Sequence, residues 1–190
     1  MIIGRILSPV HSLGPGNRVC LWTQGCSKKC DGCISPDLQN PCGIDVDESC
    51  LAELLGRVAQ KNDCPGLTIS GGDPFEQAPA LLKLLELVRG QFDDILVYTG
   101  FLLSDIVSGE TGEEGKKCLD YIDVLIDGRY IKSLNSPDCV LRGSSNQTIV
   151  FINGSKRALY ETYMEKGRMI ETFFHKNKTI ITGILNEVEE

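Results

Sequence analysis

Three cysteines stand close together at positions 26, 30 and 33, in the segment CSKKCDGC. Thiolates are soft ligands that suit zinc ions and iron–sulfur centres. An ordinary iron–sulfur cluster takes four cysteines, so three leave one iron open, as catalytic metal sites keep one position open. The spacing therefore favours an iron–sulfur cluster held by Cys26, Cys30 and Cys33, whose open iron can bind a substrate or cofactor.

A zinc site, or another redox-neutral metal site, is the alternative interpretation of the same cysteines. A structural zinc site uses four ligands, which are usually divided between two distant pairs. The compact trio has no such second pair in this sequence, so Cys42 or His11 would have to complete the site.

The cysteine count bears on the redox compartment. The chain has 190 residues and nine cysteines, and an odd number in a chain of this length argues against a secreted disulfide scaffold. Ser8, Pro9 and His11 interrupt any signal-peptide core near the start, so we expect a cytoplasmic protein. We expect Cys50, Cys64 and Cys118 to be small buried hydrophobic residues.

A second candidate site is the segment Gly71-Gly72-Asp73-Pro74, which follows the short apolar run 67–70. Glycine permits close approach of a ligand to the backbone, so this turn could bind a cofactor. The alternative is an ordinary strand-to-helix turn in which Asp73 or Pro74 starts the helix.

The elements that must position these residues follow from hydrophobic periodicity. Strands are expected over 18–23, 67–70, 95–99, 122–126 and 148–152. Helices are expected over 47–61 with Asp45 or Asp47 as N-cap, over 77–88, from 102 to 107, and over 155–166. Loops are expected over 24–43 and 109–115. Two β-prone runs, 169–174 and 179–185, predict a C-terminal hairpin around 175–178.

Strands that alternate with helices predict an α/β fold with a parallel sheet. In such sheets, sites gather at the carboxyl ends of the strands. Cys26, the turn 71–74, Gly100 and Asp127 each follow an expected strand, so we expect them at one edge of the sheet.

With these motifs in place, the chain resembles the radical-SAM superfamily. The spacing CxxxCxxC is the signature of that superfamily, and the turn 71–74 matches the GGDP variant of its glycine motif. Gly14-Pro-Gly-Asn-Arg18 resembles an element of the glycyl-radical-enzyme activating enzymes. Segments 122–130 and 141–147, together with Gly32, resemble the anaerobic ribonucleotide reductase activating proteins, and the resemblance covers roughly residues 1–152.

This resemblance implies a fold and cofactors. The implied fold is an abbreviated open (β/α) partial barrel of the radical-SAM type over residues 1–153, with a C-terminal helix and β-hairpin extension over 154–190. The implied cofactors are one [4Fe–4S] cluster on three cysteines and S-adenosyl-L-methionine (SAM). The implied cofactor-binding residues are Gly32, Ile34, Gly71, Gly72, Asp73, Pro74, Thr99, Asp127 and Arg142.

Two of these residues carry specific expected roles. Asp127 could hydrogen-bond the ribose hydroxyls of SAM, or it could be a solvated turn aspartate. Arg142 could pair with the methionine carboxylate, or it could be a surface arginine.

The implied activity is reductive cleavage of SAM to a 5′-deoxyadenosyl radical, which abstracts a glycine Cα hydrogen from a partner protein. The implied partners are a glycyl-radical enzyme, such as anaerobic ribonucleotide reductase, and a flavodoxin- or ferredoxin-type electron donor. The alternatives are a small radical-SAM enzyme that acts on another glycyl-radical enzyme, a peptide or a small molecule, and a non-enzymatic iron–sulfur or zinc binding module. A module would have no use for the glycine turn.

The chain departs from the family pattern at both ends. Ser12 and Leu13 precede Gly14, where the broader activating enzymes usually carry an acidic residue, and the chain continues well past the usual end of the family. We expect the added tail either to help recognise a partner or a second copy, or only to protect an edge of the sheet. The net charge of −7 argues against a nucleic-acid partner. The chain contains no eighteen-residue apolar run, which argues against a membrane span.

Overall fold

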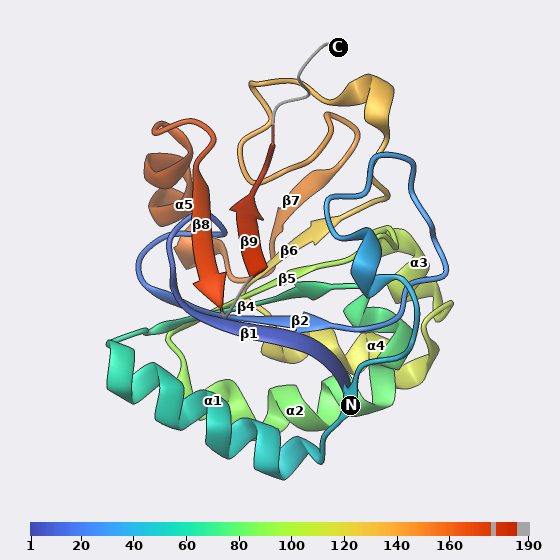
Figure 1. Cartoon of the computed structure of the whole chain (residues 1–190). Coiled ribbons are helices and arrows are strands. Elements are labelled where there is room, and N and C mark those ends of the chain that lie inside the picture. The colour runs from blue at the N-terminus through green and yellow to red at the C-terminus, as the bar shows by residue number, and fades with distance from the viewer. Residues whose placement is uncertain (176–177, 186–190) are drawn as a thin grey trace.

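The computed structural model describes residues 1–175 and 178–185. Seven strands form one sheet in the order β3-β1-β2-β4-β5-β6-β7 (Figure 1). In chain order they are β1 (Ile2–Val10), β2 (Arg18–Thr23), β3 (Ile44–Asp45), β4 (Gly66–Gly71), β5 (Asp94–Tyr98), β6 (Val124–Asp127) and β7 (Thr148–Phe151). The helices are α1 (Glu48–Asn62), α2 (Ala78–Val88), α3 (Leu103–Ser108), α4 (Gly112–Cys118) and α5 (Arg157–Met164). A separate hairpin is formed by β8 (Ile170–His175) and β9 (Lys178–Gly183).

The centre of the sheet is parallel, as the alternation of strands and helices predicts. β2, β4, β5 and β6 run parallel to their neighbours in that order. α1, α2 and the pair α3–α4 occur in the three connections between these strands, which is how parallel neighbours must be joined.

The predicted parallel sheet is confirmed at its centre, and both sides of the sheet are antiparallel. β7 pairs antiparallel with β6, because the segment between them contains only the 3₁₀ turn Lys132–Leu134 and no crossover helix. β1 pairs antiparallel with β2 and β3, and sequence patterning did not predict it. Its residues are mostly half-buried, so it lacks the continuous apolar run that marks the central strands.

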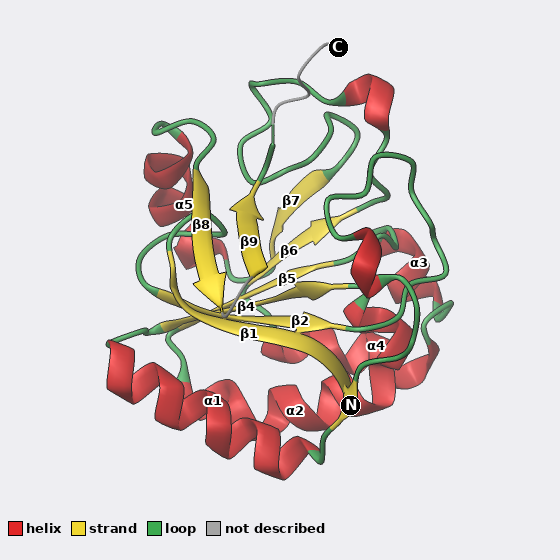
Figure 2. Ribbon diagram, viewed as in Figure 1, coloured by secondary structure: helices red, strands yellow, loops and turns green. Residues whose placement is uncertain are grey.

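α1, α2 and α4 cover one face of the sheet (Figure 2). Successive strand residues point to opposite faces, so Val19 and Leu21 of β2 join the cluster beneath these helices. Helical spacing brings Leu51 and Leu55 of α1, and Leu81 of α2, into the same fully buried cluster.

α5 and the β8–β9 hairpin cover the opposite face of the sheet (Figure 1). Tyr160 and Tyr163 of α5 are buried against strand residues that include Val124 and Ile126 of β6. Phe173 of β8 packs against a cluster that includes Trp22 of β2. The tail therefore forms the expected helix and hairpin, and the hairpin lies on the sheet face without pairing with an edge strand. The expected turn residues 176–177 lie outside the described part of the chain.

The predictions for caps, loops and single cysteines were confirmed in part. Asp47 caps α1, as expected, and its carboxylate accepts hydrogen bonds from the backbone amides of Ser49 and Cys50. The expected flexible loop over 109–115 is wrong, since α4 begins at Gly112. Cys64 and Cys118 are buried as expected, but Cys50 is exposed on the first turn of α1. Among the described helices, none combines the length and apolar character of a bilayer-spanning segment.

Candidate functional site

A cavity of about 620 Å³ lies at the carboxyl ends of the parallel strands. Its wall includes residues that follow four strands: Gly72 directly after β4, Thr99 directly after β5, Gly128 directly after β6, and Cys26 in the loop after β2. This volume is in the range of small-molecule sites, and the position is the usual one for sites in parallel sheets. Cys26, Gly72 and Gly100 therefore lie at the edge of the sheet where the sequence placed them.

Cys26, Cys30 and Cys33 all line this cavity, and each is half-buried. The loop that carries them is held at its start by backbone hydrogen bonds, from Gly25 to the Leu38 carbonyl at 2.8 Å and from Cys26 to the Gln39 carbonyl at 2.9 Å. Burial raises the pKa of the Cys26 thiol above its ordinary value. Metal binding to this cysteine would therefore release a proton.

The residues that a zinc site would need are elsewhere. Cys42 is exposed beside Gln24, and His11 hydrogen-bonds Glu171 and Asn17, and neither residue lines the cavity. Ligands around one zinc ion have sulfur atoms about 2.3 Å from the metal, so they crowd together within about 4 Å. The three thiols are not gathered within 4.8 Å of one another, so they do not present a preformed single-ion site.

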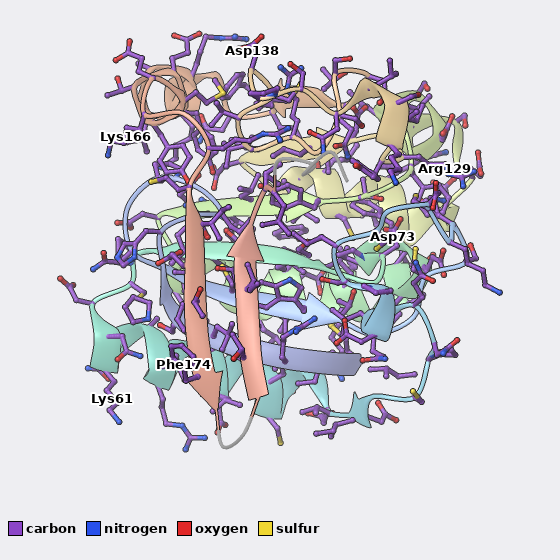
Figure 3. All side chains as sticks on the ribbon, turned by 45° about the horizontal axis from the view of Figure 1, so that its top comes forward. Lys61, Asp73, Arg129, Asp138, Lys166 and Phe174 are labelled. Carbon is purple, nitrogen blue, oxygen red and sulfur yellow. The ribbon has the colours of Figure 1, made fainter. Side chains whose placement is uncertain are left out.

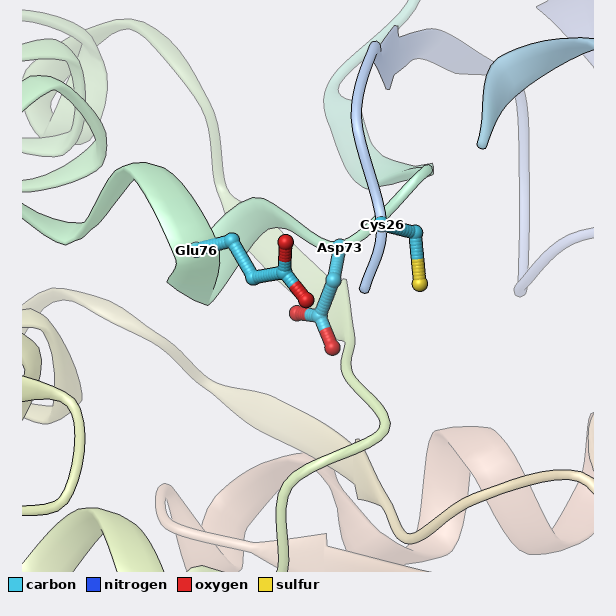
Figure 4. A group of neighbouring side chains, drawn as sticks. All are labelled: Cys26, Asp73 and Glu76. Atoms are coloured by element: carbon cyan, nitrogen blue, oxygen red, sulfur yellow. The ribbon is translucent and has the colours of Figure 1, made fainter. Parts of the chain in front are cut away.

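Cys26 does have two carboxylate neighbours, Asp73 and Glu76, with ligand atoms all within 4.8 Å (Figure 4). The Glu76 carboxylate accepts hydrogen bonds from the backbone amide of Ser27 at 2.7 Å and from its hydroxyl at 2.6 Å. Glu76 therefore fixes Ser27, the residue that follows Cys26, and the Asp73 carboxylate also accepts hydrogen bonds from the protein. We interpret the acidic pair as a support for the cysteine loop.

Asp73 is buried and joins three parts of the site. Its carboxylate accepts hydrogen bonds from the Thr99 hydroxyl at 2.8 Å, from the Gly100 amide at 2.9 Å and from the Phe75 amide at 3.1 Å. Burial raises its pKa, and the hydrogen bonds partly offset this. Asp73 also caps the 3₁₀ turn 74–77, so the turn that Asp73 and Pro74 were expected to start is present as well.

The two glycines of the turn are required by close backbone packing. Gly71 has φ +117°, and a Cβ there would collide with the Thr23 backbone. A Cβ on Gly72 would collide with the Gly25 backbone, next to Cys26. Backbone hydrogen bonds of 2.9 Å, from Gly72 to the Thr23 carbonyl and from Asp73 to the Gly25 carbonyl, fix this approach. Both glycines line the cavity, and they also bring the cysteine loop to it.

Gly32, Ile34 and Thr99 line the cavity too, so the structure brings these predicted site residues together with the cysteines. Pro74 is buried in the 3₁₀ turn and is not part of the wall.

Asp127 and Arg142 are not brought to the cavity wall. The Asp127 carboxylate is buried and accepts hydrogen bonds from the Leu103 amide at 2.8 Å and the Thr148 amide at 3.2 Å. It therefore ties α3 and β7 to the end of β6, and it is not a solvated turn aspartate. Arg142 donates to the Gln147 carbonyl at 3.0 Å, within its own loop.

Sequence reasoning missed three parts of the wall. Arg129 lines the cavity and donates a hydrogen bond of 2.6 Å to the Lys28 carbonyl, in the cysteine loop. Figure 3 shows Arg129 and Asp73 on the same side of the molecule. Lys28 itself lines the cavity, with its ammonium 3.2 Å from the centre of the Phe101 ring. Arg129 could have been found from the sequence, because it lies two residues after Asp127, at the end of an expected strand.

The third missed part is the hairpin. Residues 180–185, from β9 and the stretch that follows it, form one side of the wall. Apolar side chains of Leu13, Trp22 and Tyr98 also contribute to the wall.

This chain is similar to known proteins over most of its length. Residues 12–150 match the family model described as a 4Fe-4S single cluster domain. Proteins named anaerobic ribonucleoside-triphosphate reductase-activating protein are similar over 72% of this chain. The protein from Escherichia coli K12 is 30% identical over 145 residues, which cover 89% of its length. The protein from Pasteurella multocida is 34% identical over 142 residues, 88% of its length, and that from enterobacteria phage T4 is 34% identical over 140 residues, 85% of its length.

The matched stretch contains all three cysteines, the turn 71–74 and Arg129. This chain therefore belongs to the family of anaerobic ribonucleoside-triphosphate reductase-activating proteins, and residues 12–150 are its 4Fe-4S single cluster domain.

Proposed function

We propose that this chain is a radical-SAM activating enzyme that generates a glycyl radical on an anaerobic ribonucleotide reductase. The observation that carries the proposal is the single cavity shared by Cys26, Cys30, Cys33 and the turn at Gly71 and Gly72. The relatives' name, which describes activators of that reductase, supports the choice of partner.

The donor set fits a [4Fe–4S] cluster on three cysteines, since three half-buried thiols face one cavity and are too far apart for one ion. No fourth described cysteine lines the cavity, which fits an iron left open for SAM. The chemistry that a bound cluster supplies is one electron for the reductive cleavage of SAM to methionine and a 5′-deoxyadenosyl radical.

The remaining work of the site falls to binding, orientation and exclusion of water. We assign the methionine carboxylate of SAM to Arg129, because Arg142 does not line the cavity. Of the other cations in the wall, Lys28 lies over the Phe101 ring and Arg5 is paired with Asp37. The backbone of Gly71 and Gly72 lies where the methionine amino group can approach it closely. Leu13, Trp22 and Tyr98 provide apolar surface that limits water near the reacting carbon.

The proposal extends to the architecture and to the electron donor. The parallel strands β2, β4, β5 and β6, with helices on one face, support an abbreviated partial barrel of the radical-SAM type, with residues 1–153 as core and 154–190 as extension. A small flavodoxin- or ferredoxin-type protein would deliver the electron.

Iron analysis tests the ligand set. Anaerobic reconstitution should load the wild-type chain with a [4Fe–4S] cluster, and Cys→Ala at position 26, 30 or 33 should each lose it. Cys42→Ala and Cys50→Ala are matched controls, since both residues are exposed and outside the cavity, and both should keep the cluster. A cluster that survives in Cys30→Ala, or disappears in Cys42→Ala, would contradict the assignment.

Product analysis tests the reaction. With a strong reductant, the protein alone should convert SAM slowly to 5′-deoxyadenosine and methionine. With the reductase of the same organism, electron paramagnetic resonance should show a persistent glycyl radical, whose hyperfine splitting shrinks when the partner's glycine is deuterated at Cα. Cleavage without this radical would favour a peptide or small-molecule substrate. A full cluster without any cleavage would leave an iron–sulfur binding module.

A further inference from the structure

The C-terminal hairpin contributes to the cavity through one of its two strands. Residues 180–185 line the cavity, whereas no residue of β8 does. Figures 1 and 3 both place β9 on the side of the hairpin that faces the cysteine loop, with β8 on the far side. The matched 4Fe-4S domain ends at residue 150, so this strand is an addition to the matched domain.

The hairpin is fixed on the sheet face at its outer strand. The Glu171 carboxylate accepts hydrogen bonds of 2.8 Å from both the His11 amide and the His11 ring, and one of 2.7 Å from the Ser12 amide. The buried hydroxyls of Ser12 and Thr182 hydrogen-bond at 3.0 Å, and Phe173 packs on the cluster around Trp22. These contacts hold both strands to the core.

The far end of β9 is held as well. The Leu185 carbonyl accepts a hydrogen bond of 2.9 Å from the Arg168 guanidinium and one of 3.4 Å from the Asn135 amide. Arg168 also donates to the Cys139 carbonyl at 3.2 Å. These contacts fix β9 as a rigid part of the cavity wall. If the hairpin were a lid, all of these hydrogen bonds would have to break when it opened.

The edge of β9 that faces the cavity has no strand partner among the described residues, since β9 pairs with β8 alone. His175 pairs with Lys178 across the connection, and the register continues with Phe173 opposite Ile180 and Glu171 opposite Thr182. Backbone groups alternate between the two edges of such a strand. Counting from the closing pair, Ile181 directs its backbone N–H and C=O groups to the cavity edge, and this residue is exposed.

We propose that this edge of β9 is the docking strand for the partner's glycine-bearing segment, which adds to β9 in extended form and so enters the cavity beside the cysteines. The inference rests on the proposed function and names how its partner is recognised. An unpaired edge is a ready template for an added strand. The reactive glycine has no side chain, so its own contacts with the site are made through its backbone, and strand addition provides such contacts.

A pair of substitutions at one position isolates the backbone donor. Ile181→Pro removes the outward N–H, whereas Ile181→Ala keeps the N–H and only shortens an exposed side chain. With the reductase as partner, Ile181→Pro should raise its apparent Kd about tenfold or more, the scale of one or two lost hydrogen bonds, while Ile181→Ala should change it by less than about threefold. Iron content after reconstitution and the far-ultraviolet circular dichroism spectrum should be equal in both variants and the wild type, which shows that the fold and the cluster are intact.

Amide hydrogen exchange of the unmodified protein gives an independent readout. Binding of the reductase should slow exchange in the peptide that covers β9, and should leave the peptide that covers α1 unchanged. Faster exchange across β8 and β9 on binding would show a displaced lid and would overturn the proposal. Equal Kd values for the two Ile181 variants would overturn it too. If the wild type itself gives no glycyl radical, the proposed function fails instead.

Discussion

The hydroxyl of Thr99 donates a hydrogen bond of 2.8 Å to the carboxylate of Asp73, and this contact joins the carboxyl end of β5 to that of β4. The same carboxylate caps the turn at residues 74–77 and accepts from the Gly100 amide. One buried carboxylate therefore sets the relative position of two strand ends beside the cysteine loop.

Asp73→Ala should destabilise the protein by about 2–4 kcal/mol, because the Phe75 and Gly100 amides lose their buried acceptor. Urea denaturation of the apoprotein measures this loss. Thr99→Ser, which keeps the hydroxyl donor, is the control and should lose less than about 1.5 kcal/mol. A wild-type denaturation midpoint in Asp73→Ala would refute the structural role.

Gly72→Ala should reduce the iron content after reconstitution, since its Cβ would collide with the Gly25 backbone and displace the start of the cysteine loop. This differs from a substitution that only blocks the approach of SAM, which would leave the iron content unchanged. Gly90→Ala is the control, because a Cβ there meets no atom within 4 Å. Iron and sulfide assays on both variants decide between the two effects.

Arg129→Ala should weaken SAM binding to the reconstituted protein by about 1.5–3 kcal/mol, the scale of a hydrogen bond to a charged group. Arg142→Ala should leave SAM binding within about threefold of wild type, because Arg142 donates to the Gln147 carbonyl and does not line the cavity. Equilibrium binding of SAM to the two variants makes the comparison. The opposite ranking would restore Arg142 as the carboxylate ligand.

Arg18→Ala should destabilise the fold by about 3–5 kcal/mol, as expected when one partner of a buried ion pair is removed. Arg18 is fully buried, and its guanidinium lies 2.6 Å from the Asp94 carboxylate, which also accepts from the Tyr160 hydroxyl. Arg157→Ala, which breaks an exposed pair with Glu161 and a cation–π contact with the Phe151 ring, should cost no more than about 1.5 kcal/mol. Chemical denaturation curves of both variants provide the test.

The anchorage of the hairpin should depend on pH through Glu171. Burial raises the pKa of this carboxyl group, but hydrogen bonds from His11 and Ser12 outweigh burial and bring it below the ordinary value of 4.5. The stabilisation is therefore complete above about pH 4.5 and is lost as the pH falls through the folded-state pKa.

Amide exchange in β8 and β9, corrected for intrinsic rates, should accelerate below pH 4.5 in the wild type. Tyr163 and Cys20, whose pKa values burial and the nearby Glu171 charge raise to about 12, stay neutral in this range. In Glu171→Gln the acceleration should be absent, and an unchanged pH dependence in this variant would assign the effect to another group.

The sequence determined the features that depend on short spacing. Three cysteines within one loop, two glycines after an apolar strand, and apolar residues at helical intervals in α1 and α2 act through local geometry. Such geometry is the same wherever the segment lies in the fold, so the cysteine loop, the parallel core and the edge that carries the site could all be predicted.

Only the tertiary structure decided which polar side chains of the later loops reach the cavity. Asp127 turns to the amides of α3 and β7, and Arg142 to a carbonyl of its own loop, while Arg129 faces the cysteines. It also decided that β9 forms a wall of the cavity. These outcomes depend on packing between segments far apart in the chain, because each charged group hydrogen-bonds the backbone partner that the fold brings within reach. Spacing along the sequence does not determine which partner that is.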